Sequence, residues 1–199
     1  MKLKVSVIGT GYLGATHAAC MSSMGFEVVG IDVDALKISA LASGKIPFYE
    51  PDLQELLQKE ISSGRLTFST DFNSIADADV HFICVGTPQL ENSLAADLQY
   101  IDAALEAIAP ICKPGSLVVG KSTVPVGTAA RLREKLLRIN PEADLAWNPE
   151  FLREGFAVED TLRPNRLVVG VTSDAAENTL KEIYRTNLEA KTPWVRADL

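Results

Sequence analysis

Two carboxylates stand four residues apart in the segment NPEFLREG, residues 148–155. Glu150 and Glu154 are separated by an apolar pair and by Arg153. A carboxylate pair can accept protons and order water beside a developing positive charge. The same spacing also fits an exposed first turn of a helix, whose glutamates pair with Arg153 or with free amide groups. The rest of the chain must decide between a reactive site and a solvated helix start.

A glycine-rich motif, GTGYLG at residues 9–14, follows an apolar run and opens a segment with helical periodicity. Strand, glycine-rich turn and helix form the fingerprint of a dinucleotide site, in which free N–H groups and the helix dipole hold a diphosphate. The glycines alone would equally suit a structural turn, but the second strand and its terminal carboxylate strengthen the dinucleotide interpretation. The expected cofactor contacts in this turn are Gly9, Gly11, Tyr12, Leu13 and Gly14.

Asp32 ends the second expected strand, where a dinucleotide site places the adenosine ribose. A carboxylate there can accept hydrogen bonds from both ribose hydroxyls and would repel the 2′-phosphate of NADP. Because no arginine stands beside Asp32, the motif favours NAD as the cofactor. Lys37 either extends toward the adenine end of the cofactor or is an ordinary surface lysine.

The segment VGTP, residues 85–88, ends another apolar run. The sequence predicts that Val85, Gly86 and Thr87 lie beside the nicotinamide half of the cofactor. Gly86 would let the backbone pass close to that ring, since glycine has no side chain to obstruct it. The motif alone does not establish a function.

The segment KSTVPVGT, residues 121–128, leads from a further strand into an expected helix. Thr123 stands at this transition, so its hydroxyl is expected at the ligand edge of the sheet, near the nicotinamide. The alternative is that Ser122 or Thr123 only caps the following helix, and Pro125 close to a helix start fits that alternative well.

Short apolar runs alternate with amphipathic segments throughout the chain. Continuously apolar strands joined by helices indicate an α/β fold, a Rossmann-like doubly wound, mainly parallel sheet with helices on both faces. In such a sheet ligands bind outside the carboxyl ends of the strands. The expected strands are 5–8, 26–31, 66–69, 80–85, 117–120, 144–147, 166–171 and 192–195, and the expected helices are 11–24, 35–42, 52–62, 98–108, 126–137 and 175–184.

Composition excludes several classes of function for these 199 residues. A net charge of −7 disfavours a nucleic-acid partner. No apolar run is long enough for a membrane span, and the N-terminus lacks the features of a signal peptide. The three scattered cysteines favour neither disulfides nor zinc, which fits a cytoplasmic protein. His17 and His81 are expected as packing or surface residues, so no metal site is predicted.

The motifs, in their order, resemble the nucleotide-sugar 6-dehydrogenase family, and within it the UDP-glucose 6-dehydrogenase type. The resemblance rests on GTGYLG, VGTP, KSTVPVGT and above all NPEFLREG, followed by Asp160 and by PNRLVVG at residues 164–170. It extends to GKIPFYEPDLQELL at residues 44–57 and covers essentially the whole chain. EPDL in place of the family's usual EPGL, and ENSLAADL at residues 91–98, depart from the pattern and make fine substrate contacts less certain.

The resemblance implies a reaction: the C6 alcohol of UDP-glucose is oxidised to the carboxylate of UDP-glucuronate by two hydride transfers to NAD, as a step in polysaccharide precursor synthesis. A cysteine holds the intermediate, first as a thiohemiacetal and then as a thioester that water hydrolyses. By this resemblance Glu150 takes part in thioester hydrolysis, and Glu154 and Thr123 lie near the nicotinamide and an ordered water. The implied substrate contacts are Glu150, Phe151, Leu152 and Arg153.

The family's nucleophilic cysteine lies in a glycine-rich segment that this chain lacks. Cys20, Cys84 and Cys112 all fit packing positions, with no neighbouring base to activate them. We therefore expect residues 1–199 to be the N-terminal NAD-binding domain of a longer enzyme, without its central helix and C-terminal domain. Such a fragment would bind NAD without completing the oxidation. It is expected as a monomer, whereas the full-length protein would be a homodimer.

Four alternatives stay open from the sequence. GDP-mannose 6-dehydrogenases share FLREG, and only the PNRLVVG block favours UDP-glucose over GDP-mannose. Enzymes for N-acetylated sugars fit less well, because they tend to lack FLREG. A module that senses NAD without catalysing a reaction would need the same cofactor motif. A hydroxyacid or hydroxyacyl dehydrogenase would need it too. NPEFLREG has no evident purpose in either kind of protein.

Overall fold

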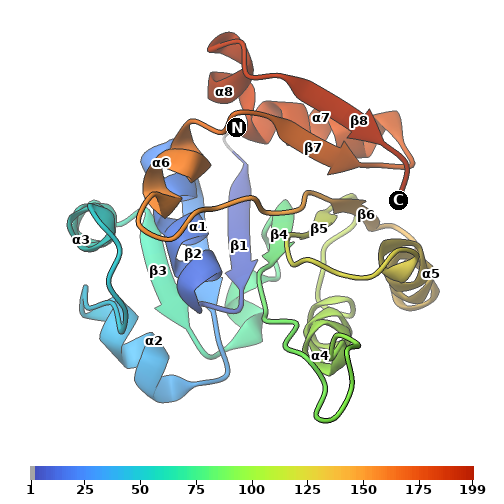
Figure 1. Ribbon diagram of the computed structural model, residues 1–199, viewed down its shortest axis with the longest axis horizontal. Coiled ribbons are helices and arrows are strands. Elements are labelled where there is room, and N and C mark those ends of the chain that lie inside the picture. Colours follow the sequence, from blue (N-terminus) through green and yellow to red (C-terminus); the bar gives the residue numbers. More distant parts are fainter. Residues whose placement is uncertain (1–2) are drawn as a thin grey trace.

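The computed structural model describes residues 3–199, which form an eight-stranded sheet covered by helices (Figure 1). The strand order is β3-β2-β1-β4-β5-β6-β7-β8. The strands are β1 (Lys4–Ile8), β2 (Glu27–Ile31), β3 (Leu66–Ser69), β4 (Val80–Ile83), β5 (Leu117–Gly120), β6 (Asp144–Trp147), β7 (Leu167–Gly170) and β8 (Trp194–Ala197). The helices are α1 (Tyr12–Ser23), α2 (Ala35–Ala42), α3 (Leu53–Ser62), α4 (Gln99–Ile108), α5 (Thr128–Ile139), α6 (Ala157–Leu162), α7 (Asp174–Ile183), α8 (Arg185–Glu189) and the 3₁₀ turn η1 (Phe72–Ile75).

The sheet reverses its winding at β1, which pairs with β2 on one side and β4 on the other. All strand pairs are parallel except β6 with β7, where Trp147 opposes Gly170. The carboxyl ends of β1 and β4 therefore diverge around a crevice, which is where open α/β sheets bind ligands. The expected doubly wound, mainly parallel fold is confirmed.

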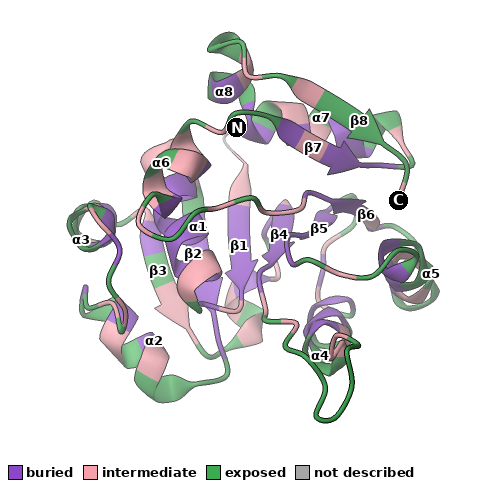
Figure 2. Ribbon diagram, viewed as in Figure 1, coloured by how far each residue is buried: buried purple, intermediate pink, exposed green. Residues whose placement is uncertain are grey.

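Alternate strand residues enter two apolar layers, one on each face of the sheet. Figure 2 shows that the central strands are buried along most of their length. Val5 and Val7 pack with α1, α3 and α7, whereas Ile8 packs with α4 and α5. Both faces are buried because side chains along a strand point alternately to its two sides. The central strands are consequently apolar at nearly every position, as the sequence predicted.

Two short helices were not predicted, and several boundaries differ. Helix α6 has six residues and α8 has five, and such lengths show too little periodicity to be recognised in a sequence. Helix α5 begins at Thr128, two residues after the expected start, because Gly127 precedes it in a left-handed conformation with φ +85°. Among residues 3–199, no helix combines the length and apolar character needed to cross a bilayer.

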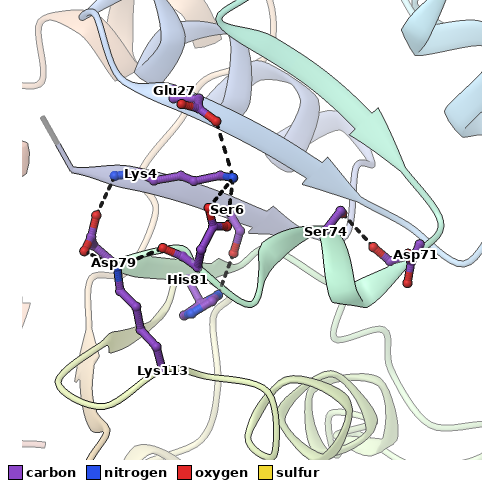
Figure 3. A network of polar contacts seen from close by, with 9 residues as sticks. Lys4, Ser6, Glu27, Asp71, Ser74, Asp79, His81 and Lys113 are labelled. Carbon is purple, nitrogen blue, oxygen red and sulfur yellow. Dashed lines mark hydrogen bonds and ion pairs between the residues drawn. The ribbon is translucent and has the colours of Figure 1, made fainter.

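Ion pairs join the loops and strands at the amino-terminal ends of β1, β2 and β4, away from the crevice (Figure 3). Lys4 pairs through Nζ with Asp77 at 2.8 Å, and its backbone N–H donates to Asp79 at 2.7 Å. Deeper in the sheet, the Ser6 hydroxyl lies 2.8 Å from His81 Nδ1. Burial, helped by the charge of Lys113, lowers the pKa of His81 to about 4, so its imidazole is neutral near pH 7. These contacts stabilise the amino-terminal ends of the strands, whereas the crevice for ligands lies at their carboxyl ends.

Candidate functional site

The glycine-rich turn brings the backbone of residues 9–14 to the crevice. Gly9 adopts φ +86°, which side chains disfavour, and a Cβ on Gly14 would lie 1.8 Å from the Gly9 carbonyl oxygen. A Cβ on Gly11 would meet nothing within 4 Å, so the space above this residue is open to a ligand. Helix α1 begins at Tyr12, and its free N–H groups therefore face that space. The geometry suits a diphosphate at the positive end of the helix dipole.

Asp32 stands at the end of β2 with its carboxylate held in a fixed position. Its Oδ2 accepts hydrogen bonds from the Thr10 N–H at 2.8 Å and from Lys37 Nζ at 2.8 Å, and its Oδ1 accepts from the Asp34 N–H at 3.1 Å. Burial opposes ionisation, but the hydrogen bonds from Lys37, Asp34 and Thr10 outweigh it and lower the pKa of Asp32. Lys37 is therefore not an unpaired surface lysine. Its ammonium group holds the Asp32 carboxylate in place.

A cavity of about 460 Å³ lies beside this carboxylate and the glycine-rich turn. Its lining is largely apolar apart from Asp32 and Lys37, and it includes Gly9, Gly11, Val85 and Gly86. The open space above Gly11, the apolar walls and the ionised Asp32 fit the diphosphate, the rings and the ribose of a dinucleotide. The cavity thus brings together half of the residues that the sequence singled out for the cofactor, namely Gly9, Gly11, Asp32, Lys37, Val85 and Gly86.

The VGTP and KSTVPVGT segments are joined directly at this edge. The Ser122 hydroxyl donates to the Val85 carbonyl at 2.6 Å, and the Thr87 hydroxyl donates to the Thr123 carbonyl at 2.8 Å. Neither Ser122 nor Thr123 caps a helix, because α5 starts at Thr128. The capping alternative is wrong, and the Thr123 side chain is exposed to the crevice edge.

Glu150 does not lie in a helix, so the solvated helix start proposed as an alternative is also wrong: residues 148–156 have no regular secondary structure. The Glu150 carboxylate accepts from Lys121 Nζ at 2.8 Å, and the two side chains are 18% and 6% exposed. Burial opposes the charge on Lys121, but the facing Tyr184 and Glu150 oxygens raise its pKa above the usual value. Lys121 and Glu150 therefore form a largely buried ion pair at the crevice.

Asn148 and Tyr184 complete the surroundings of Lys121. Asn148 Oδ1 accepts from Lys121 Nζ at 3.2 Å and from the Tyr184 hydroxyl at 2.6 Å, while its Nδ2 donates to the Val168 carbonyl at 2.8 Å. The network therefore joins the ends of β5, β6 and α7. The sequence did not predict this role for Lys121, Asn148 or Tyr184, although the first two lie inside the quoted motifs and polar residues at strand ends were a usable signal.

A second cavity, of about 250 Å³, opens directly onto Glu150. Phe151 and Arg153, predicted as substrate contacts, line it together with Asn165, Arg166 and Tyr184. The Arg166 guanidinium stacks over the Phe151 ring at 4.9 Å. Arg153 pairs with Asp160 at 2.7 Å rather than with either glutamate. Leu152, expected to contact substrate, is half-buried and is not part of the lining.

Glu154 and Gly155 follow this cavity and lead back to the glycine-rich turn. The Glu154 side chain is exposed and has no hydrogen bond or ion pair within residues 3–199. The buried Glu50 carboxylate joins the two regions, since it accepts from the Tyr12 hydroxyl and from the Gly155 N–H at 2.9 Å. NPEFLREG and the glycine-rich turn therefore occupy one edge of the sheet, as the sequence predicted from the strand ends.

All three cysteines are buried, as the sequence context predicted for Cys20 and Cys84. Burial raises the pKa of Cys20 and Cys84 to about 12 and that of Cys112 to about 11. A thiol is a nucleophile only as the thiolate, so none of the three is prepared for covalent catalysis. Throughout the described part of the chain, no three acidic, histidine or cysteine side chains gather in a way that could hold a metal ion.

The sequence of this chain matches a family of known dehydrogenases. The model of the UDP-glucose/GDP-mannose dehydrogenase family, NAD binding domain, matches residues 3–188. The chain belongs to the UDP-glucose/GDP-mannose dehydrogenase family. The expected family is thus confirmed, and so is NAD as the cofactor of the domain.

Individual members are similar along nearly the whole chain. The UDP-glucose 6-dehydrogenase of Rhizobium meliloti (strain 1021) is 42% identical over 198 residues, covering 97% of this chain and 45% of that protein. The solved UDP-glucose dehydrogenase of Pyrobaculum islandicum superposes with a TM-score of 0.92 at 36% identity, covering 100% of this chain and 46% of that one. A ternary complex of GDP-mannose dehydrogenase from Pseudomonas aeruginosa gives 0.91 at 36%, covering 98% and 46%. The chain therefore spans less than half the length of these relatives.

Proposed function

We propose that this chain supplies the cofactor site and the acid–base groups of an NAD-dependent nucleotide-sugar 6-dehydrogenase that oxidises UDP-glucose to UDP-glucuronate. The observation that carries the proposal is the placement of two cavities at one sheet edge. One is lined by the glycine-rich turn and Asp32, and the other by the Lys121–Glu150 ion pair. A cofactor and a polar substrate can therefore meet between them.

The residues of the first cavity bind and orient the cofactor. The α1 amino end holds the diphosphate, and the carboxylate of Asp32, fixed by Lys37, accepts the ribose hydroxyls. When bound, NAD supplies the hydride acceptor. Val85 and Gly86 line that cavity and supply the wall on the nicotinamide side, and the hydroxyl of Thr87, the next residue, donates to the Thr123 carbonyl. These roles follow from position in the crevice and from the family's motif.

The residues of the second cavity handle the sugar and its protons. Lys121 holds the Glu150 carboxylate at a defined position, so that Glu150 can accept a proton from water or from the C6 hydroxyl. Glu154, exposed four residues further along the same loop, can hold a water at the crevice. Phe151 and Arg153 line the sugar side, and Arg166 adds a positive charge suited to a nucleotide diphosphate. A nucleophilic thiolate is not available from Cys20, Cys84 or Cys112, so the covalent step would need a thiol from outside these residues.

UDP-glucose is preferred as the substrate because relatives named for it, from Rhizobium meliloti, Bacillus subtilis, Pseudomonas aeruginosa and Rickettsia felis, are 37–42% identical, whereas GDP-mannose 6-dehydrogenases of Pseudomonas syringae and Pseudomonas savastanoi are 37% and 36% identical. The PNRLVVG segment, which provides Arg166 to the second cavity, supports the same choice. GDP-mannose is the second candidate, because the GDP-mannose dehydrogenase of Pseudomonas aeruginosa superposes almost equally well.

Two measurements test the proposal. Calorimetric titration of the 199-residue chain should show that NAD binds at least about tenfold more tightly than NADP, because Asp32 repels a 2′-phosphate. Equal or tighter NADP binding would contradict the role given to Asp32.

The second measurement uses the longest natural polypeptide that contains these residues. NADH absorbance should rise with UDP-glucose and much less with GDP-mannose or UDP-N-acetyl sugars. Glu150→Gln should slow that turnover by at least about a hundredfold while changing NAD affinity little, since Glu150 faces the second cavity. A rise with GDP-mannose alone would establish the second candidate, and NAD binding without any turnover would favour an NAD-sensing module.

A further inference from the structure

Glu50 is a buried carboxylate that belongs to neither cavity's proposed chemistry. It lies in the loop between α2 and α3 and is 3% exposed. Within residues 3–199 no lysine or arginine comes within ion-pair distance of it. A charge buried without a cation must be stabilised by hydrogen bonds, so its three donors show what it holds in place.

The three donors come from both halves of the site. Glu50 Oε2 accepts from the Tyr12 hydroxyl at 2.5 Å and from the Gly155 N–H at 2.9 Å, and Oε1 accepts from the Ala157 N–H at 2.7 Å. Tyr12 is the first residue of α1, next to the open space above Gly11. Gly155 adjoins Glu154, and Ala157 is the first residue of α6. One carboxylate therefore joins the cofactor turn to the end of the NPEFLREG segment, and Glu50 itself lies 105 residues before Gly155 in the sequence.

The Tyr12 hydroxyl is a dependable donor to this carboxylate. Burial, reinforced by the hydrogen bond to Glu50, raises the pKa of Tyr12 to about 12, so the phenol stays protonated near neutral pH. Its ring also packs against Phe48, with centroids 5.1 Å apart, on the same loop that carries Glu50. Anything that fixes the start of α1 therefore fixes the position of Glu50 Oε2.

Besides Glu50, two other side chains hold the loop of residues 150–156. Lys121 holds Glu150 at one end, and Asp160 accepts three hydrogen bonds from the backbone and side chain of Arg153. Gly155, at φ +83°, turns the chain into α6 and has Glu50 as the acceptor of its N–H. The side chain of Glu154 makes no hydrogen bond or ion pair within residues 3–199, and its backbone is held on one side by Asp160, through Arg153, and on the other by Glu50, through Gly155.

We infer that Glu50 is a positioning residue that couples NAD binding at the glycine-rich turn to the order of the 150–156 loop. The inference rests on the proposed role of that turn in binding the cofactor. A ligand on the first N–H groups of α1 restricts Tyr12, which steadies the carboxylate and, through it, the Gly155 and Ala157 amides. By linkage, a loop already held by Glu50 favours cofactor binding to the same extent.

Hydrogen exchange of the Gly155 and Ala157 amides, followed by NMR on the 199-residue chain, tests the coupling. In the wild type, saturating NAD should slow their exchange at least about threefold. Tyr12→Phe removes the hydroxyl and keeps the ring, so NAD at saturating concentration should no longer slow these amides. Glu50→Gln leaves one acceptor oxygen for two amides, so their exchange should be faster and equally fast with and without NAD.

Neighbouring residues provide matched controls. Tyr49 is 85% exposed and Glu55 is exposed on α3, so Tyr49→Phe and Glu55→Gln should keep the wild-type response to NAD. A residue with only a structural role would change exchange by the same factor in the free and the bound state. The inference is overturned if Tyr12→Phe keeps the NAD-dependent slowing, and this holds even if Glu50→Gln fails to fold.

The two proposals fail in different ways. If calorimetry detects no NAD binding by the wild-type chain, the proposed cofactor site is wrong and the coupling falls with it. If NAD binds but the slowing is absent or survives in Tyr12→Phe, only the coupling is wrong.

Discussion

Replacing Lys121 by methionine would leave the Glu150 carboxylate in its cleft without a cation. The ammonium lies 2.8 Å from Glu150 Oε2, and the side chains of Lys121 and Glu150 are 6% and 18% exposed. Methionine keeps the apolar stem, so the change removes the charge and the contact with Asn148 Oδ1 at 3.2 Å. Losing one member of a buried ion pair costs about 3–5 kcal/mol. Because water reaches one side of Glu150, we expect the lower end, about 3 kcal/mol of unfolding free energy.

Urea unfolding followed by tryptophan fluorescence measures this loss, and a double-mutant cycle assigns it. Lys121→Met combined with Glu150→Gln removes both charges, so the double variant should regain about 2 kcal/mol relative to Lys121→Met alone. Lys113→Met is a matched control: its ion pair with Asp79 is 2.6 Å long, but the side chains are 38% and 32% exposed. This control should cost less than about 1 kcal/mol. Equal losses at Lys121 and Lys113, or simple additivity in the cycle, would refute the buried-pair argument.

Three other substitutions test different parts of the fold and site. Asp32→Ser should weaken NAD binding about 10–100-fold and narrow the preference over NADP, because charge-assisted hydrogen bonds are lost and Lys37 is released from its carboxylate; an unchanged NAD-to-NADP ratio in calorimetry would contradict this. Asp52 precedes α3 at φ +63°, so Asp52→Gly should raise the unfolding free energy by about 0.5–1 kcal/mol, and a loss in urea unfolding would show that the side chain has a compensating contact. Burial and the charge of Lys113 lower the pKa of His81 from 6.5 to about 4. On acidification the unfolded chain therefore binds the proton at a higher pH than the folded chain does. The contribution of His81 to stability is present above pH 6.5, and we expect the unfolding free energy to fall by about 2 kcal/mol between pH 7 and pH 5. His81→Gln should flatten that part of the pH profile, and an unchanged slope would mean that other groups cause it.

The sequence predicted the sheet and its ligand edge because these follow from local patterns. Apolar runs ending at Gly9 and Asp32, and the glycines between them, are signals within a few residues of each other. The left-handed Asp52 explains why EPDL stood out against the family's EPGL: glycine adopts that conformation without strain, whereas aspartate only tolerates it. That departure therefore concerns a helix start and not a substrate contact.

The charges that hold the site were not predictable in the same way. Lys121 and Glu150, or Glu50 and Gly155, meet only because crossovers return the chain to one sheet edge. A sequence indicates that a polar residue ends a strand, but not which residue from another strand neutralises it. The partner of Lys37 could still be proposed locally, since Asp32 is five residues away.

The two glutamates of NPEFLREG differ in how they are held, and this bears on their roles. Glu150 is fixed by Lys121 in a partly dry cleft, and such a carboxylate can act as a base only at a defined position. Glu154 is exposed, and only its flanking backbone is held, by Asp160 at Arg153 and by Glu50 at Gly155. A group of this kind can follow a water or a ligand as the loop becomes ordered. The four-residue spacing therefore does not make a symmetric pair: a positioned base and an adjustable carboxylate share one loop, and their anchors lie on opposite sides of the crevice.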